Sequence, residues 1–135
     1  GWAVVNLKPK TKNWLDIAQD DFEVAGYLFE KKKYLYCIFF CQQTIEKAIK
    51  AVYFEKYNKT PPRKHDLMAL AGAVGILPEL DEATKDFFDL LSQYYLESRY
   101  AEDRDAMVIS CTGPLTKNLL NKAGELLTWL ENKLK

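Results

Sequence analysis

The sequence has 135 residues, enough for one domain whose hydrophobic core needs neither metals nor disulfide bonds. Lys plus Arg (19) balances Asp plus Glu (19), so the formal net charge is zero. This balance argues against bulk, non-specific nucleic-acid binding, for which a basic domain is expected. With 48% apolar and 28% charged residues, the composition is that of a folded globular protein and excludes a disordered chain.

Cysteine usage and hydropathy favour a cytoplasmic protein. The chain has an odd number of cysteines, which argues against a disulfide framework, and we interpret Cys37 and Cys41 as small core residues. No apolar stretch approaches the ~20 residues of a membrane span, and no signal-peptide pattern opens the chain. We therefore expect no membrane association. Residues 1–12 are assigned to an N-terminal extension and residues 13–135 to a single helical domain.

The first half of the domain shows strong helical periodicity. The first predicted helix begins with Asn13 as N-cap and ends at the run from Glu30 to Lys33. The second, residues 34–57, is apolar over most of its circumference, so we expect neighbours to cover it on more than one side. At about 1.5 Å per residue it would be roughly 36 Å long, which suits the central helix of a bundle.

Three further helices are predicted after the break at Thr60-Pro61-Pro62. A short one runs from Asp66 or Leu67 to about Val74, and a long one covers about 81–98. A polar stretch and a connection then lead to Thr112-Gly113-Pro114, which starts the last helix. The sequence therefore predicts an all-α fold, an up-and-down bundle of four long helices plus one short helix.

Most catalytic templates are absent from the chain. There is one histidine, no Cys-x-x-Cys pair and no Gly-rich phosphate loop, so we expect no metal and no cofactor. Polar groups nevertheless interrupt the apolar second helix, where Gln43, Glu46 and Lys50 share one face. They form either a solvated stripe with a Glu46–Lys50 ion pair, or a polar seam that contacts a ligand or partner.

Two more segments carry polar chemistry. In Lys64-His65-Asp66-Leu67, Asp66 is an N-cap type, and His65 is interpreted as a structural histidine in preference to a catalytic one. In the segment 94–104, Arg99 lies one turn after Tyr95, at the edge of the core-facing side. Its guanidinium suits a carboxylate or phosphate, and nearby tyrosines could stack on a base. The alternative is an ion pair of Arg99 with Glu97, Glu102 or Asp103.

In this order, the segments resemble the HEPN superfamily over roughly residues 14–130. The resemblance rests on Ala18 with Asp21, the run from Gln42 to Ala51, His65-Asp66-Leu67, and Arg99-Tyr100-Ala101 with Glu102-Asp103. It implies a helical bundle that often forms symmetric homodimers and an association with nucleotides or RNA. Many such proteins are RNases, frequently toxins, with Arg followed four to six residues later by His. Others are encoded beside a minimal nucleotidyltransferase and act as its toxin or antitoxin partner.

The sequence departs from this RNase pattern after Arg99. The positions where the histidine would stand hold Arg104, Asp105 and Ala106, none of which can act as imidazole does near neutral pH. The leading hypothesis is therefore a HEPN-type module that lacks the complete RNase motif and binds a nucleotide, an RNA or a nucleotidyltransferase. Arg99 would contact the anion, Tyr95 or Tyr100 would stack, and Lys47 or Lys50 would add charge.

Two alternatives stay open. The first is a metal-independent RNase that uses Arg99 with a nonstandard base, either Asp103 or His65. The second is a purely structural bundle that forms a homodimer. The full set of candidate ligand- or partner-binding residues is Arg99, Tyr100, Tyr95, Asp103, Glu46, Lys47, Gln43, Lys50 and His65.

Overall fold

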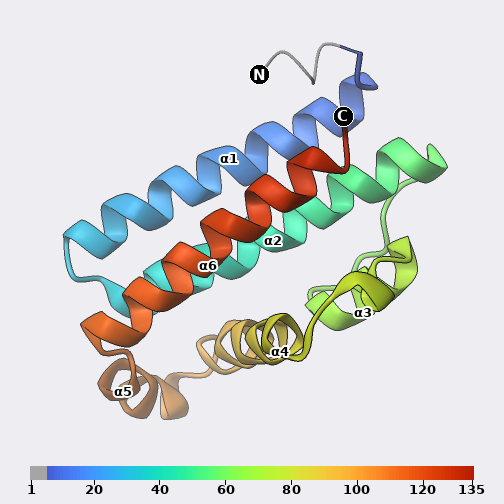
Figure 1. Cartoon of the computed structure of the whole chain (residues 1–135). Helices are drawn as coiled ribbons and strands as arrows, with labels where there is room; N and C mark the ends of the chain where they lie inside the picture. The colour runs from blue at the N-terminus through green and yellow to red at the C-terminus, as the bar shows by residue number, and fades with distance from the viewer. Residues whose placement is uncertain (1–5) are drawn as a thin grey trace.

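A computed structural model describes residues 6–135, and within them all regular secondary structure is helical (Figure 1). This confirms the predicted fold class. The elements in chain order are α1 (Pro9–Glu30), α2 (Tyr34–Tyr57), α3 (Leu67–Val74), the short 3₁₀ helix η2 (Leu77–Glu79), α4 (Glu82–Glu97), α5 (Ala101–Ser110) and α6 (Gly113–Asn132).

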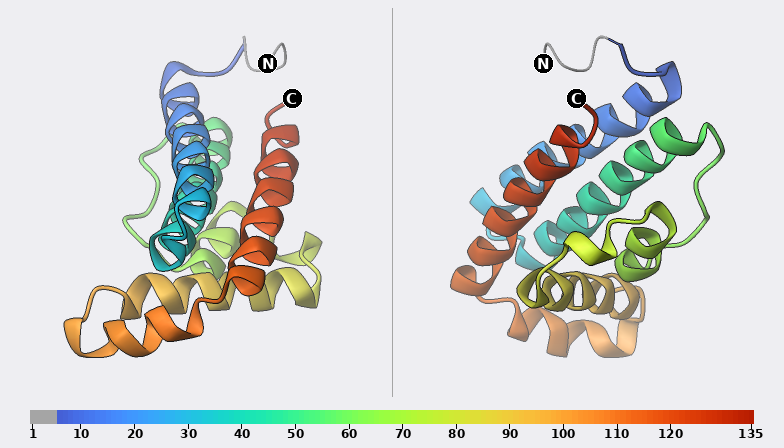
Figure 2. Two further views of the ribbon diagram at one scale, coloured as in Figure 1. Left: turned by 90° about the vertical axis from the view of Figure 1, so that its left-hand side faces the viewer. Right: turned by 45° about the vertical axis from the view of Figure 1, so that its right-hand side comes forward.

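The second helix is the centre of the molecule. α1 and α6 pack along it and against each other, while α3, α4 and α5 contact it from other sides. Figure 2 shows α1, α2 and α6 running together, with α4 and α5 lying across one end of this group. Each of the other α-helices therefore touches α2, as its nearly continuous apolar surface predicts.

Burial along α2 is correspondingly high. Its apolar residues form the middle of the core, and the thiols of Cys37 and Cys41 are buried and free, as predicted. Four polar residues of α2 are buried with them: Gln42, Thr44, Glu46 and Lys50. Thr44 donates its hydroxyl hydrogen to the carbonyl of Phe40, one turn back, at 2.8 Å. The other three belong to a network described below.

Three helices begin at a residue whose side chain caps them, and one of these residues, Asp66, is the predicted cap of the short helix. Asp66, Asp81 and Thr112 cap α3, α4 and α6, each accepting a hydrogen bond from a backbone N–H three residues later. Gly75 ends α3 in the left-handed conformation, with φ of 83°, which glycine adopts without steric cost.

Two predicted boundaries are wrong. α1 begins at Pro9 and not after Asn13, so four residues assigned to an extension are helical. Proline at the first helical position has no N–H to lose, and its fixed φ suits the helix. The region assigned to a connection after residue 98 contains a further helix, α5. Its described side chains are mostly exposed and only Met107 is buried, so it has no apolar periodicity to reveal it. Residues 1–5 of the predicted extension lie outside the described part.

Within residues 6–135, no helix is both long and apolar enough to cross a membrane.

Candidate functional site

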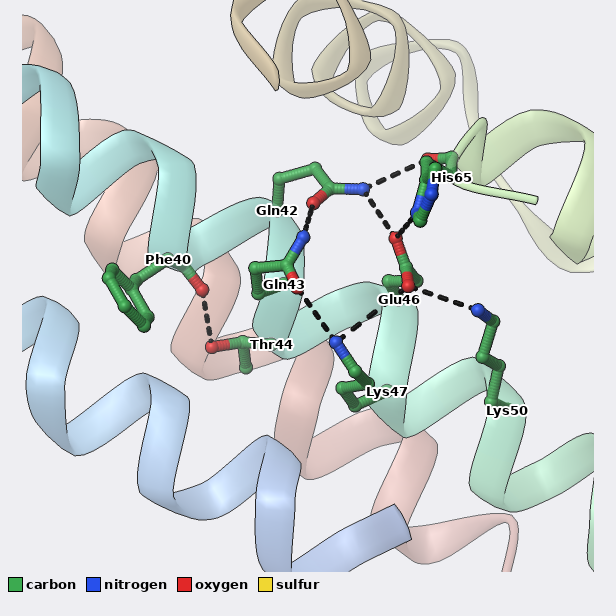
Figure 3. A network of polar contacts seen from close by, with 8 residues as sticks. All are labelled: Phe40, Gln42, Gln43, Thr44, Glu46, Lys47, Lys50 and His65. Atoms are coloured by element: carbon green, nitrogen blue, oxygen red, sulfur yellow. Dashed lines mark hydrogen bonds and ion pairs between the residues drawn. The ribbon is translucent and has the colours of Figure 1, made fainter. Parts of the chain in front are cut away.

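A continuous polar network runs along α2 beneath the turn that precedes α3 (Figure 3). We call it the α2 network; its members are Gln42, Gln43, Glu46, Lys47 and Lys50. The Lys47 ammonium donates to Gln43 Oε1 at 2.7 Å, and Gln43 Nε2 donates to Gln42 Oε1 at 2.6 Å. Gln42 Nε2 donates in turn to Glu46 Oε1 at 3.1 Å. One side chain therefore fixes the next over two helical turns.

The Glu46 carboxylate is the centre of the network. Glu46 is 1% exposed, and Lys50, which donates to Glu46 Oε2 at 3.0 Å, is 6% exposed. The Glu46–Lys50 pair predicted from the spacing is confirmed, but it lies in the protein interior and the expected solvated stripe is wrong. Burial acts to raise the pKa of Glu46, yet hydrogen bonds from Gln42, His65 and Lys50 outweigh it, so the pKa is lowered. The carboxylate is therefore ionised.

Asp21 of α1 lies close to the same charges. The pKa of the Asp21 carboxyl is raised, mainly by burial and further by the charges of Asp20 and Glu46. The positive charge of Lys47 partly offsets this rise. This carboxyl, one of the positions that carry the family resemblance, therefore borders the α2 network on the side of α1.

His65 attaches the turn before α3 to this carboxylate. Its Nδ1 lies 2.9 Å from Glu46 Oε1, and its backbone carbonyl accepts a hydrogen bond from Gln42 Nε2 at 2.9 Å. Asp66, the N-cap of α3, fixes the chain immediately after it. The imidazole remains half exposed, at 50%. His65 is therefore held by the interior on one edge and open to solvent on the other.

A row of rings connects His65 to Arg99. The Tyr95 ring of α4 stacks on Phe39 of α2, with centroids 5.2 Å apart, and lies 4.9 Å from the His65 ring. The guanidinium carbon of Arg99 lies 5.6 Å from the Tyr95 centroid. Burial raises the pKa of Tyr95, the Arg99 charge lowers it, and Glu46 raises it, with a net rise. Tyr95 thus contacts both His65 and Arg99.

Arg99 also lines a pocket of about 140 Å³ that we call the arginine pocket. Its walls come from the start of α2 and from the α4–α5 junction: Leu35, Tyr36, Phe39, Ser98, Arg99 and Arg104. Arg104 donates to the Tyr36 hydroxyl at 3.2 Å and lies over the same ring. The lining of this small pocket therefore combines two guanidinium groups with two aromatic rings.

The Arg99 guanidinium makes none of the three ion pairs considered from the sequence, with Glu97, Glu102 or Asp103, within residues 6–135. It remains exposed, over the Tyr95 ring. A guanidinium that lacks a carboxylate partner retains its donors for an external anion.

The predicted site residues fall into two sets. Gln43, Glu46, Lys47, Lys50, His65, Tyr95 and Arg99 form one connected group. Tyr100 and Asp103 do not join it: Tyr100 is half exposed at the start of α5, and Asp103 lines a different pocket between α4 and α5. Sequence reasoning missed Tyr36, Phe39 and Arg104 as neighbours of Arg99. In the sequence, Phe39 counts only as part of the apolar surface of the second helix, Tyr36 gives no signal, and Arg104 stands out only as a replaced histidine.

In the described part of the chain, no group of three His, Cys, Asp or Glu side chains is placed to hold a metal ion. The site consists of hydrogen-bond donors, cations and aromatic faces around one buried carboxylate, that of Glu46.

The crystal structure of TT1696 from Thermus thermophilus has the same fold, with a TM-score of 0.81 and 20% sequence identity, over 93% of this chain and 99% of that one. No curated protein sequence matches the chain significantly. The model of the HEPN domain matches residues 11–133. This chain therefore belongs to the HEPN domain family.

Proposed function

We propose that the protein is a HEPN-type module that binds a nucleotide or a short RNA segment at the arginine pocket. The observation that carries the proposal is a pair of guanidinium groups, Arg99 and Arg104, that line one pocket together with the aromatic side chains of Tyr36 and Phe39. Arginine matches the geometry of a phosphate with its fixed N–H donors, and aromatic faces stack on bases. Membership of the HEPN family points to the same nucleotide- or RNA-related role.

The zero net charge determines how strongly the proposed binding should depend on salt. Because the net charge is zero, the affinity comes from a few local contacts and not from a general positive field. Two phosphate contacts on a single strand give a salt slope of only about −1.4 in log affinity against log salt. A much steeper slope would place the binding on a wider basic surface and would contradict the arginine pocket.

The direct test is titration of ATP and of a short fluorescent single-stranded RNA, by calorimetry and anisotropy. Arg99→Ala should weaken binding about tenfold, the effect of losing one charge-assisted hydrogen bond. Lys12→Ala is the matched control, since it removes one positive charge from an exposed ion pair on α1, away from the pocket. Absence of binding by the natural sequence, or equal binding by Arg99→Ala, would overturn the proposal.

We further propose a nucleotidyltransferase as protein partner, with this chain as the toxin or antitoxin component of the pair. The support is the resemblance of four motifs to HEPN modules encoded beside minimal nucleotidyltransferases. Co-expression with the product of the neighbouring reading frame, followed by co-purification, tests it. A neighbour of another class, or a nucleotidyltransferase that elutes separately, would contradict the partnership.

A homodimer is the proposed assembly. Its support is the exposure of four large apolar side chains on α4, on α5 and at the junction between them: Leu96, Tyr100, Val108 and Ile109, the last of which is 80% exposed. A second copy of this chain would cover these side chains and remove them from water. Sedimentation analysis should give a dimer that Ile109→Asp dissociates, and a monomer at micromolar concentration would refute this assembly.

A second candidate function, metal-independent RNA cleavage, is favoured by one observation. His65 is held by a buried carboxylate and adjoins Tyr95, which carries Arg99 on its ring. The His65 Nε2 would accept the proton of a ribose 2′-hydroxyl while that oxygen bonds to the adjacent phosphorus. The bond from phosphorus to the 5′-oxygen would break, and water would protonate that oxygen. Asp103 gains no support as the base, because it lines another pocket.

Incubation of RNA with the protein and EDTA tests this function. Cleavage that is lost in both His65→Ala and Arg99→Ala would establish it, and intact RNA would end it. Asp103→Asn is the control, since it should leave any cleavage unchanged.

A further inference from the structure

The contact between Glu46 and His65 determines which nitrogen of the imidazole carries the hydrogen. An ionised carboxylate only accepts hydrogen bonds, so the contact between His65 Nδ1 and Glu46 Oε1 at 2.9 Å requires Nδ1 to carry the hydrogen. In the neutral imidazole the proton then resides on Nδ1, and Nε2 presents a lone pair. The interior thus sets the tautomer and leaves an acceptor at the exposed edge of the ring.

That acceptor has no hydrogen-bond partner within residues 6–135. Nearby polar side chains have other partners: Lys50 and Gln42 donate to Glu46, Lys47 donates to Gln43, and Tyr95 packs against the imidazole with its ring. A fixed acceptor on a half-exposed ring favours a ligand that offers a hydrogen-bond donor there.

The position of His65 relative to Arg99 indicates which part of a bound nucleotide strand would lie near the imidazole. The Tyr95 ring lies 4.9 Å from the His65 ring and 5.6 Å from the guanidinium carbon of Arg99, so a single aromatic ring links His65 to a residue of the arginine pocket. In a nucleotide strand, a phosphate and the adjoining sugar are separated by only a few bonds. A strand whose phosphate occupies the pocket therefore brings its sugar near Tyr95 and His65.

We propose that His65, held by Glu46, accepts a hydrogen bond from the ribose 2′-hydroxyl of the bound strand and so selects RNA over DNA. This inference rests on the proposed nucleotide-binding function and names its ligand class. The 2′-hydroxyl is the donor that RNA has and DNA lacks. Phosphate oxygens are acceptors, and a neutral imidazole with its lone pair outward gives them no hydrogen bond.

The test compares three oligonucleotides of one sequence, with ribose, 2′-deoxyribose or 2′-O-methylribose, in anisotropy titrations at pH 8. The natural sequence should bind the ribose strand about fivefold more tightly than the other two, the effect of one neutral hydrogen bond. The 2′-O-methyl strand keeps the oxygen but has no hydrogen to donate. Gel analysis after each titration verifies that the RNA remains intact.

His65→Phe is the decisive variant, because it keeps a ring against Tyr95 and removes both nitrogens. It should bind all three strands equally, at the affinity that the natural sequence shows for DNA. Arg99→Ala is the contrasting variant and should weaken all three strands by the same factor. Circular dichroism and thermal unfolding of both variants verify that they fold.

The outcomes separate this inference from the function it rests on. If no strand binds to the natural sequence, the proposed function itself fails. If all strands bind equally to the natural sequence, or if His65→Phe weakens RNA and DNA alike, nucleotide binding stands and the role of His65 in selecting ribose is refuted.

Discussion

Two clusters of charge, both in contact with Tyr95, differ in how completely their groups are paired. In the α2 network the buried Glu46 carboxylate is bound by Gln42, Lys50 and His65. In the arginine pocket, Arg99 is exposed and contacts an aromatic face in place of a carboxylate. A buried charge must be satisfied for the fold to form, whereas an unpaired exposed one costs little. The first cluster therefore supports structure, and the second is available to a ligand.

The largest effect should come from Glu46→Gln. It removes the only carboxylate near the Lys50 ammonium within the described residues, and a buried charge left without its partner costs about 3 kcal/mol. Urea denaturation should show this loss in the free energy of unfolding. Asp16→Asn is the matched control: Lys12 and Asp16 form an exposed pair at the same four-residue spacing, and the change should be below about 0.5 kcal/mol.

A double variant sharpens this prediction. Glu46→Leu with Lys50→Met removes both charges and keeps similar volumes, so it should recover at least half of the stability lost in Glu46→Leu alone. Equal losses in the single and double variants would mean that the hydrogen bonds to Gln42 and His65, and not the charge pair, account for the effect.

The next largest effect should come from Arg99→Ala in the arginine pocket, where we expect a loss of RNA affinity without a loss of stability. Arg99→Ala should change the free energy of unfolding by less than about 0.5 kcal/mol, since the side chain is exposed and has no carboxylate partner among the described residues. The binding free energy of the variant for RNA should nevertheless weaken by about 1.4 kcal/mol, which is a tenfold loss of affinity. Loss of stability as large as that of Glu46→Gln would mean that the two clusters are not functionally distinct.

A smaller effect is expected from acid, because protonation keeps the shape of Glu46. Since hydrogen bonds lower its pKa in the folded protein, the carboxylate contributes stability above the usual glutamate pKa of about 4.3. That contribution is lost as the pH falls through the lower, folded value. The difference in unfolding free energy between the natural sequence and Glu46→Gln should therefore shrink with acid. A constant difference would contradict the lowered pKa.

Much of the fold could be predicted because its signals are local. Proline breaks, the capping residues Asp66, Asp81 and Thr112, and the apolar surface of α2 each act within one or two helical turns. α5 could not be predicted, because a short helix whose described side chains are exposed, except that of Met107, has almost no periodicity. Its formation depends on packing against α4, which is a tertiary effect.

The site was predictable in part, for a related reason. The i, i+4 spacing predicts the contact between Glu46 and Lys50, but not its burial, which depends on the turn that carries His65. No sequence pattern places His65 against Tyr95, 30 positions along the chain. Likewise, the meeting of Arg99 and Arg104 with Tyr36 requires α5 to fold back toward the start of α2.

The smallest effects should come from the two predicted site residues that lie outside both clusters. Tyr100→Ala and Asp103→Ala should each change RNA affinity less than twofold, since Tyr100 is half exposed and Asp103 lines the pocket between α4 and α5. Both lie within five residues of Arg99, so they test whether position in the sequence or position in the fold defines the site. A loss equal to that of Arg99→Ala in either variant would extend the ligand across the start of α5. Unchanged affinity in both would limit it to the arginine pocket and the adjoining Tyr95 and His65.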